Sequence, residues 1–107
     1  DNEFYLDEIY IKDVIDAILL VVNKETEGTF NIGGGKAYSI LEMAETANLI
    51  FNNEKNIEVT SGVKKYNQSN FLSIQKIKEH LNWSPRFDLK KSLIDMKEAY
   101  EIRKDSQ

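Results

Sequence analysis

Hydrophobic and polar residues recur with two different periods along the chain, and each period predicts a type of secondary structure. Three runs have the short alternation or the β-branched and aromatic content of strands: 8–11, 29–32 and 56–60. Four stretches place apolar residues every three or four positions, as on one side of a helix: 14–22, 40–52, 74–81 and 89–100. The predicted order is β-α-β-α-β-α-α, which indicates an α/β fold.

Residues that cap helices lie where the helical periodicity begins. A side-chain oxygen at a helix start accepts a hydrogen bond from one of the first backbone N–H groups, which have no partner within the helix. Ser39 and Glu42 have the spacing of a capping box, in which each side chain bonds the other residue's backbone. Single capping residues are predicted for the other three helices: Asp13, Ser73 and Asp88.

Three consecutive glycines, 33–35, follow the second predicted strand and invite comparison with phosphate-binding loops. The spacing of a Walker loop would require a glycine near Phe30 and a hydroxyl residue at Ala37. The dinucleotide fingerprint would require its third glycine at Tyr38. Because both spacings fail, we interpret the triplet as a structural turn.

The chain has 107 residues, of which 41% are hydrophobic and 30% charged, as expected of one domain or part of one. Its longest apolar run, 17–22, is much shorter than the roughly 20 residues that cross a bilayer, so no membrane span is predicted. The net charge of −4 argues against nucleic acid as a partner. The absence of cysteine fits a reducing cytoplasm, and the acidic start without an initiator methionine suggests a fragment.

Two patterns that could indicate catalysis have simpler structural explanations. Tyr100 and Lys104 have the Tyr-x-x-x-Lys spacing of a known catalytic pair, but they lie in the last eight residues, at the end of a predicted helix. His80 is the single histidine and has no nucleophile near it in sequence. We therefore predict neither a catalytic residue nor a metal ligand in this chain.

The polar loop at 61–70 is the most binding-like stretch of the sequence. Lys64 and Lys65 supply two cations beside the aromatic ring of Tyr66, and several amides follow. Such groups can contact phosphate, uracil or sugar hydroxyls. A charged loop that faces solvent without a ligand is the alternative interpretation.

Four motifs in collinear order resemble the C-terminal part of extended short-chain dehydrogenases, the NAD-dependent nucleotide-sugar epimerases and dehydratases. The segment 8–17 is similar to the family's pattern (F/Y)-I-(H/Y)-V-x-D-(V/L)-x-x-A, and 28–42 is similar to its strand, glycine turn and helix cap. The closing pattern D-x-x-K-(A/I)-x-x-x-L-G-W-x-P, followed by L-x-x-G-L, resembles 73–85 and 89–93. The likeness covers nearly the whole chain.

The resemblance implies that residues 1–107 form a single substrate-binding portion of a larger enzyme, with the run 29–32 at the edge of a Rossmann-type sheet. In such enzymes the Rossmann domain supplies the NAD site and the catalytic residues, so the fragment alone is expected to lack NAD, the dinucleotide fingerprint and activity. The implied ligand is a UDP-, dTDP- or GDP-linked sugar. The residues predicted to bind it are Lys64, Lys65, Tyr66 and Tyr10.

Departures from the family pattern keep a second interpretation open. Family members carry an arginine just before the first matching strand, where this chain has Leu6, and a second arginine in the neighbourhood of Lys64. A lysine supplies charge but not the bidentate geometry of arginine. The alternative is therefore a non-catalytic interaction module that keeps the scaffold without the ligand. In either case, helix packing or strand-edge pairing through uncovered apolar surface predicts self-association.

Overall fold

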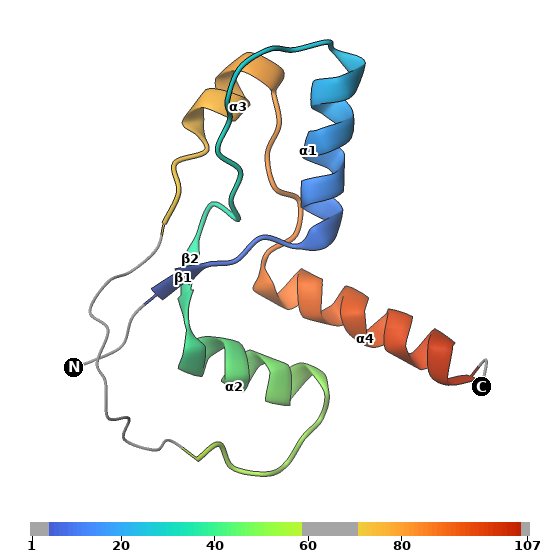
Figure 1. Cartoon of the computed structure of the whole chain (residues 1–107). Coiled ribbons are helices and arrows are strands. Elements are labelled where there is room, and N and C mark those ends of the chain that lie inside the picture. Colours follow the sequence, from blue (N-terminus) through green and yellow to red (C-terminus); the bar gives the residue numbers. More distant parts are fainter. Residues whose placement is uncertain (1–4, 59–70, 106–107) are drawn as a thin grey trace.

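The computed structural model describes residues 5–58 and 71–105 and shows helices arranged around a small sheet (Figure 1). The elements are, in chain order, β1 (Tyr5–Asp7), α1 (Ile11–Asn23), β2 (Ala37–Ser39), α2 (Ile40–Ile50), α3 (Gln75–Leu81) and α4 (Leu89–Asp105). The mixed α/β class predicted from the sequence is confirmed.

The two strands differ in position from the predicted ones. β1 and β2 pair antiparallel, with Leu6 opposite Tyr38. Residues 8–10 instead lead directly into α1, and 29–32 form no strand although their exposure alternates. The described part of the third predicted strand, 56–58, is also irregular. A strand forms where a segment distant in sequence can pair with it. The alternation of apolar and polar residues alone therefore did not predict the positions of β1 and β2.

Helix α1 begins two residues before its predicted cap. Tyr10 occupies the N-cap position and makes no side-chain capping bond there. Asp13, predicted as the cap, lies inside the first turn with 1% of its surface exposed. Its carboxylate accepts hydrogen bonds from another segment of the chain, so the prediction of a capping role was wrong.

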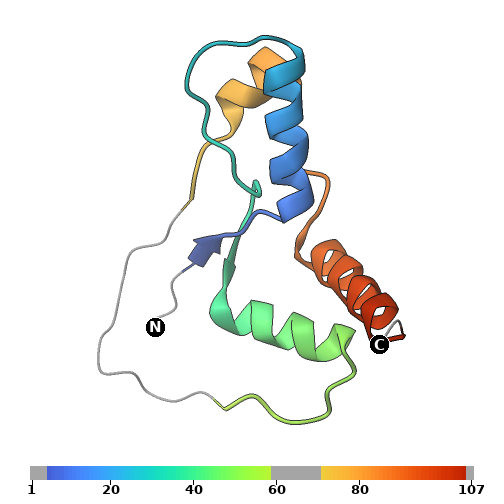
Figure 2. The ribbon, with the colours of Figure 1, turned by 45° about the vertical axis from the view of Figure 1, so that its right-hand side comes forward.

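The hydrophobic core lies between α1 and α3, which stand side by side in both views (Figure 1, Figure 2). Ala17 of α1 and Ile77 of α3 are almost fully buried, and Trp83 covers them from the segment after α3. Phe30 and Ile32 pack against the same core from the irregular stretch that precedes β2. This extended stretch therefore contributes apolar side chains without pairing as a strand.

Side-chain capping fixes the starts of α2 and α4, but not the start of α3. Ser39 and Glu42 form the predicted capping box at the start of α2. The Asp88 carboxylate accepts a hydrogen bond from the Lys91 N–H at 2.8 Å, as predicted for the start of α4. Ile74 is the N-cap of α3 rather than Ser73, whose hydroxyl accepts a longer bond of 3.4 Å from the Gln75 N–H.

The molecule is flat and open. Its principal extents are 48, 43 and 17 Å, and its radius of gyration is 16.8 Å, whereas about 13 Å is usual for a compact chain of this length. Helices α2 and α4 contact each other at the end of the molecule remote from α3 (Figure 2). Within the described ranges, none of the helices combines the length and apolarity that a membrane crossing requires.

Candidate functional site

The glycine turn is packed against β1 through the carboxylate of Asp7. This carboxylate accepts hydrogen bonds from the N–H groups of Gly34, at 2.7 Å, and Leu72, at 2.9 Å. A Cβ atom on Gly34 would lie 1.8 Å from the carbonyl oxygen of Glu8, so only glycine fits this approach of two backbones. This close packing supports the interpretation of the triplet as a structural turn.

The same contact argues against a dinucleotide at this turn. A phosphate-binding loop presents free backbone N–H groups to an anion. Here the Gly34 N–H is already bonded to a carboxylate of the chain itself, and that negative charge would repel a diphosphate. The Gly34 N–H is therefore not available to an anion in this structure.

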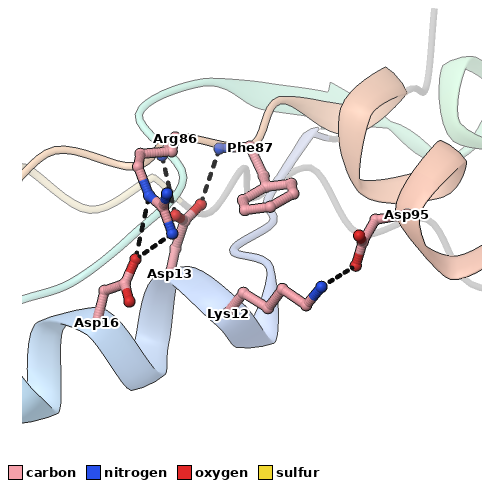
Figure 3. A network of polar contacts seen from close by, with 6 residues as sticks. All are labelled: Lys12, Asp13, Asp16, Arg86, Phe87 and Asp95. Atoms are coloured by element: carbon pink, nitrogen blue, oxygen red, sulfur yellow. Dashed lines mark hydrogen bonds and ion pairs between the residues drawn. The ribbon is translucent and has the colours of Figure 1, made fainter. Parts of the chain in front are cut away.

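A network of polar contacts joins α1 to the segment before α4 (Figure 3). The buried Asp13 carboxylate accepts hydrogen bonds from the backbone N–H groups of Arg86, at 2.9 Å, and Phe87, at 3.0 Å. One turn along the same helix, an oxygen of Asp16 accepts two bonds from the Arg86 guanidinium, at 3.1 and 2.6 Å. These contacts position the chain that brings Phe87 and the start of α4 beside Tyr10.

Tyr10, the described member of the predicted ligand-binding set, forms a chain of contacts with Asp95 and Lys12. Its hydroxyl donates a hydrogen bond of 2.6 Å to the Asp95 carboxylate, which lies 2.8 Å from the Lys12 ammonium. The bond to Asp95, with burial and the negative charge of that carboxylate, raises the pKa of Tyr10 to about 12. Hydrogen bonds from Lys12 and then Tyr10 lower the pKa of Asp95. Tyr10 is therefore held neutral, as a donor rather than a base.

A cavity of about 70 Å³ opens beside Tyr10, between the glycine turn, β2 and α4. The aromatic rings of Tyr10, Tyr38 and Phe87 line it together with Ser92 and Met96. The ring centroids of Tyr10 and Phe87 are 4.9 Å apart, which fixes one wall. This volume holds a few water molecules, so by itself the cavity is too small for a nucleotide or a sugar.

The structure gives a position to one of the four predicted ligand-binding residues. Lys64, Lys65 and Tyr66 lie outside the described residues. The chain that follows them is tied to the glycine turn by the bond between Leu72 and Asp7. These three residues and Tyr10 stay predictions as a ligand site.

The two patterns set aside as catalytic candidates lie away from this cavity. Tyr100 is half exposed near the end of α4, with the Arg103 guanidinium over its ring. The His80 Nδ1 atom is 2.9 Å from the Lys76 carbonyl oxygen on α3. Asp95 and Asp7 were not predicted as part of the site. Their partners are 85, 27 and 65 residues away in sequence, so no local spacing could identify them.

Comparison with known proteins shows what this chain is similar to. No protein-family model matches the sequence. Individual relatives and solved structures nevertheless confirm the predicted resemblance to nucleotide-sugar epimerases and dehydratases of the extended short-chain dehydrogenase class.

Three relatives illustrate the similarity. UDP-glucuronic acid decarboxylase 5 of Arabidopsis thaliana is 27% identical over 94 residues, which span 88% of this chain and 28% of the relative. The structure of UDP-glucose 4-epimerase from Thermotoga maritima, solved with UDP-glucose, matches with a TM-score of 0.79 and 27% sequence identity. The match covers 100% of this chain and 34% of the epimerase chain. WbmF of Bordetella bronchiseptica, in complex with NAD+ and UDP, matches with a TM-score of 0.76 and 25% identity. This match covers 94% of this chain and 30% of the WbmF chain. The chain thus spans about a third or less of each relative.

Proposed function

We propose that this chain is the C-terminal, nucleotide-sugar-binding portion of an NAD-dependent enzyme that acts on UDP-sugars, and that it is inactive alone. The observation that carries the proposal is the similarity along 88–100% of the chain to two enzymes named for, or solved with, a UDP-sugar. Their names include an epimerase and a decarboxylase. The proposal therefore extends to UDP-sugars as a class and leaves the reaction to the catalytic domain.

In this proposal NAD binds to a separate dinucleotide-binding domain. Support comes from the glycine turn, where the Gly34 N–H is already bonded to Asp7, and from the similarity to WbmF, which was solved with NAD+ and UDP. The irregular stretch 29–32 would complete the edge of that domain's sheet, since Phe30 and Ile32 already face the core. We expect titration calorimetry of the 107-residue chain to detect no NAD or NADH binding. A micromolar site would contradict this part of the proposal.

The proposed ligand contacts are Lys64 and Lys65 with the diphosphate, and Tyr66 and Tyr10 with the base or sugar. Two adjacent lysines supply the positive charge that a diphosphate requires, although without the paired donors of an arginine. The Tyr10 hydroxyl donates its hydrogen bond to Asp95. Its oxygen can still accept a hydrogen bond from a hydroxyl group of the ligand. A loop that brings the lysines over the Tyr10 cavity would form one continuous site.

Saturation-transfer NMR with UDP-glucose, UDP-glucuronic acid, a dTDP-sugar and a GDP-sugar tests the ligand. We expect signal from the UDP-sugars and its loss in the double variant Lys64→Ala, Lys65→Ala. The matched control is Lys90→Ala, Lys91→Ala, which removes two consecutive lysines that are exposed on α4. Equal losses in both variants would show a nonspecific charge effect.

The second candidate function is a non-catalytic interaction module. The exposed apolar side chains of α1 favour it, because they provide a surface for a protein partner rather than for a sugar. If none of the nucleotide-sugars gives a saturation-transfer signal, this candidate is favoured over the first. Self-association is a separate proposal that holds for either function, since it needs no ligand.

A further inference from the structure

Two hydroxyl groups at the cavity beside Tyr10 have fixed hydrogen-bonding roles. The Tyr10 hydroxyl donates to Asp95 at 2.6 Å, and Asp95 lies on α4 between Ser92 and Met96, which both line the cavity. The Ser92 hydroxyl donates to the Asp88 carbonyl oxygen at 2.7 Å. A hydroxyl group has one proton and two lone pairs. Because both protons are already engaged, Tyr10 and Ser92 can only accept hydrogen bonds from a ligand.

Tyr38 has the opposite role on the same cavity. Its hydroxyl oxygen accepts a hydrogen bond of 3.3 Å from the Leu89 N–H, so its own proton remains for donation. The lining residues thus offer two acceptors and one donor. An alcohol group, which donates and accepts at once, is complementary to this combination.

The lining of the cavity carries negative charge. Glu8 and Asp88 belong to it, and the described residues that line it include no lysine, arginine or histidine. Lys36 lies against the Tyr38 ring, 5.0 Å from the ring centroid, and is not part of the lining. A carboxylate inside the cavity would therefore be repelled by two like charges, whereas a neutral alcohol would not.

The volume of the cavity limits which part of a ligand can enter. About 70 Å³ holds a few water molecules, which corresponds to a side group of about two or three heavy atoms rather than a sugar ring. On a hexose, the hydroxymethyl group projects from the ring on a carbon atom of its own. The other hydroxyl groups are attached to the ring directly and cannot enter so small a space without it.

We propose that this cavity binds the hydroxymethyl group of a neutral UDP-hexose and excludes the carboxylate of a uronic acid. The inference rests on the proposed function, because it requires that the chain binds a UDP-sugar. The hydroxymethyl oxygen accepts a hydrogen bond from Tyr38 and donates one to Tyr10 or Ser92. The names of the relatives include both a glucose and a glucuronic acid, so the similarity alone does not distinguish these two ligands.

Isothermal titration calorimetry of the 107-residue chain with UDP-glucose, UDP-xylose and UDP-glucuronic acid tests the inference. The three ligands differ only in the substituent on C5 of the sugar, which is a hydroxymethyl group, a hydrogen atom or a carboxylate. We expect UDP-glucose to bind most tightly. UDP-xylose should bind about three- to tenfold more weakly because it lacks the hydrogen bonds of the hydroxymethyl group. UDP-glucuronic acid should bind about tenfold more weakly or worse, because its carboxylate is repelled.

Two variants identify the residues responsible for the preference. Tyr10→Phe removes an acceptor and should weaken UDP-glucose about fivefold while leaving UDP-xylose unchanged. Asp95→Ala releases the Tyr10 proton for donation into the cavity, and it should narrow the difference between UDP-glucose and UDP-glucuronic acid. A general loss of stability would weaken all three ligands alike and would not change these ratios. The matched control is Tyr100→Phe, which removes a hydroxyl group from a half-exposed ring near the end of α4 and should change no affinity.

The outcomes separate this inference from the proposed function. Equal affinities for the three ligands overturn the inference and leave the proposed function in place. Tighter binding of UDP-glucuronic acid than of UDP-glucose does the same. Equal weakening of UDP-glucose and UDP-xylose by Tyr10→Phe overturns the role of Tyr10 in the preference. If none of the three ligands binds, the inference and the proposed function are both wrong.

Discussion

The hydroxyl of Tyr10 and the carboxylate of Asp95 lie 2.6 Å apart although 85 residues separate them in the chain. The bond connects the start of α1 with the middle of α4 and so joins the α1–α3 core to the α2–α4 end of a flat molecule. The Lys12 ammonium contacts the same carboxylate. Asp95 therefore accepts the Tyr10 hydroxyl proton and pairs with a cation two residues further along the chain. Tyr10 thereby has a fixed ring position beside the cavity where a ligand contact is proposed.

Replacing Asp95 with asparagine should lower the pKa of Tyr10 from about 12 toward the ordinary value near 10. The substitution removes the anionic acceptor that favours the protonated phenol. NMR of 13C-labelled tyrosine, with the Tyr10 signal assigned through Tyr10→Phe, follows the titration directly. Asp16→Asn, which removes a carboxylate bonded to Arg86, should leave the Tyr10 curve in place.

The Tyr10 contact also predicts a loss of stability in alkali. An unfolded tyrosine releases its proton near pH 10, whereas the folded one keeps it until about pH 12. The unfolded state thus binds fewer protons in this window, and the stabilisation present below pH 10 is lost as the pH rises through 12. Urea denaturation across this range should show a smaller alkaline decline for Tyr10→Phe than for the wild type. Equal declines would contradict the assignment.

The buried Asp13 should be the most sensitive carboxylate to substitution. Asp13→Ala leaves the N–H groups of Arg86 and Phe87 without an acceptor, so we expect a loss of about 2–4 kcal/mol in the free energy of unfolding. Asp16→Ala, which breaks a solvent-exposed ion pair on the same helix, should cost less than about 1 kcal/mol. Urea titrations of the two variants provide the comparison. Similar costs would show that Asp13 does not hold this segment.

Among the four glycines that the structure describes, Gly34 should tolerate alanine least. A Cβ atom there would overlap the Glu8 carbonyl oxygen, so the glycine turn and the chain after β1 must separate, at a cost of about 3 kcal/mol or more. Gly28 is the matched control, because its φ of +122° strains an alanine but its nearest neighbour is 4.0 Å away. We expect about 1–2 kcal/mol for Gly28→Ala in thermal or urea unfolding. The reverse order would mean that backbone conformation outweighs the close approach.

The capping box gives a smaller effect confined to one helix. Ser39→Ala removes the acceptor of the Glu42 N–H, and about 1 kcal/mol should be lost. Thr46→Ala is the control, since the Thr46 hydroxyl bonds a backbone carbonyl within α2 on an exposed face. Chemical denaturation of both variants and of Glu42→Ala would test whether the two partners act as a pair. If the free energies of unfolding lost in Ser39→Ala and Glu42→Ala add up in the double variant that carries both changes, the two residues do not form a reciprocal capping box.

Sequence predicted the parts of the fold that depend on near neighbours. The capping box at Ser39 and the Asp88 cap involve residues three positions apart, so their chemistry is legible in the sequence. The resemblance to nucleotide-sugar epimerases and dehydratases could also be found in the sequence, because four motifs in order carry information that no single motif does.

The predictions were wrong where the structure of a residue depends on a segment distant in sequence. β2 is strand only because Tyr38 lies opposite Leu6, and nothing local marks its three residues. Asp13 has the composition of a cap, but its acceptors serve backbone groups 73 and 74 residues away. Asp95 gave no local signal for the same reason, since Tyr10 is its partner through folding alone.

The carboxylate of Asp7 has a further consequence for motion. Its two oxygens accept hydrogen bonds from two backbone amides, Oδ1 from Gly34 and Oδ2 from Leu72. A fluctuation that withdraws this carboxylate exposes both amides to solvent together, which couples their hydrogen exchange. We therefore expect hydrogen exchange at Gly34 and Leu72 to change together in any variant that moves the Asp7 carboxylate.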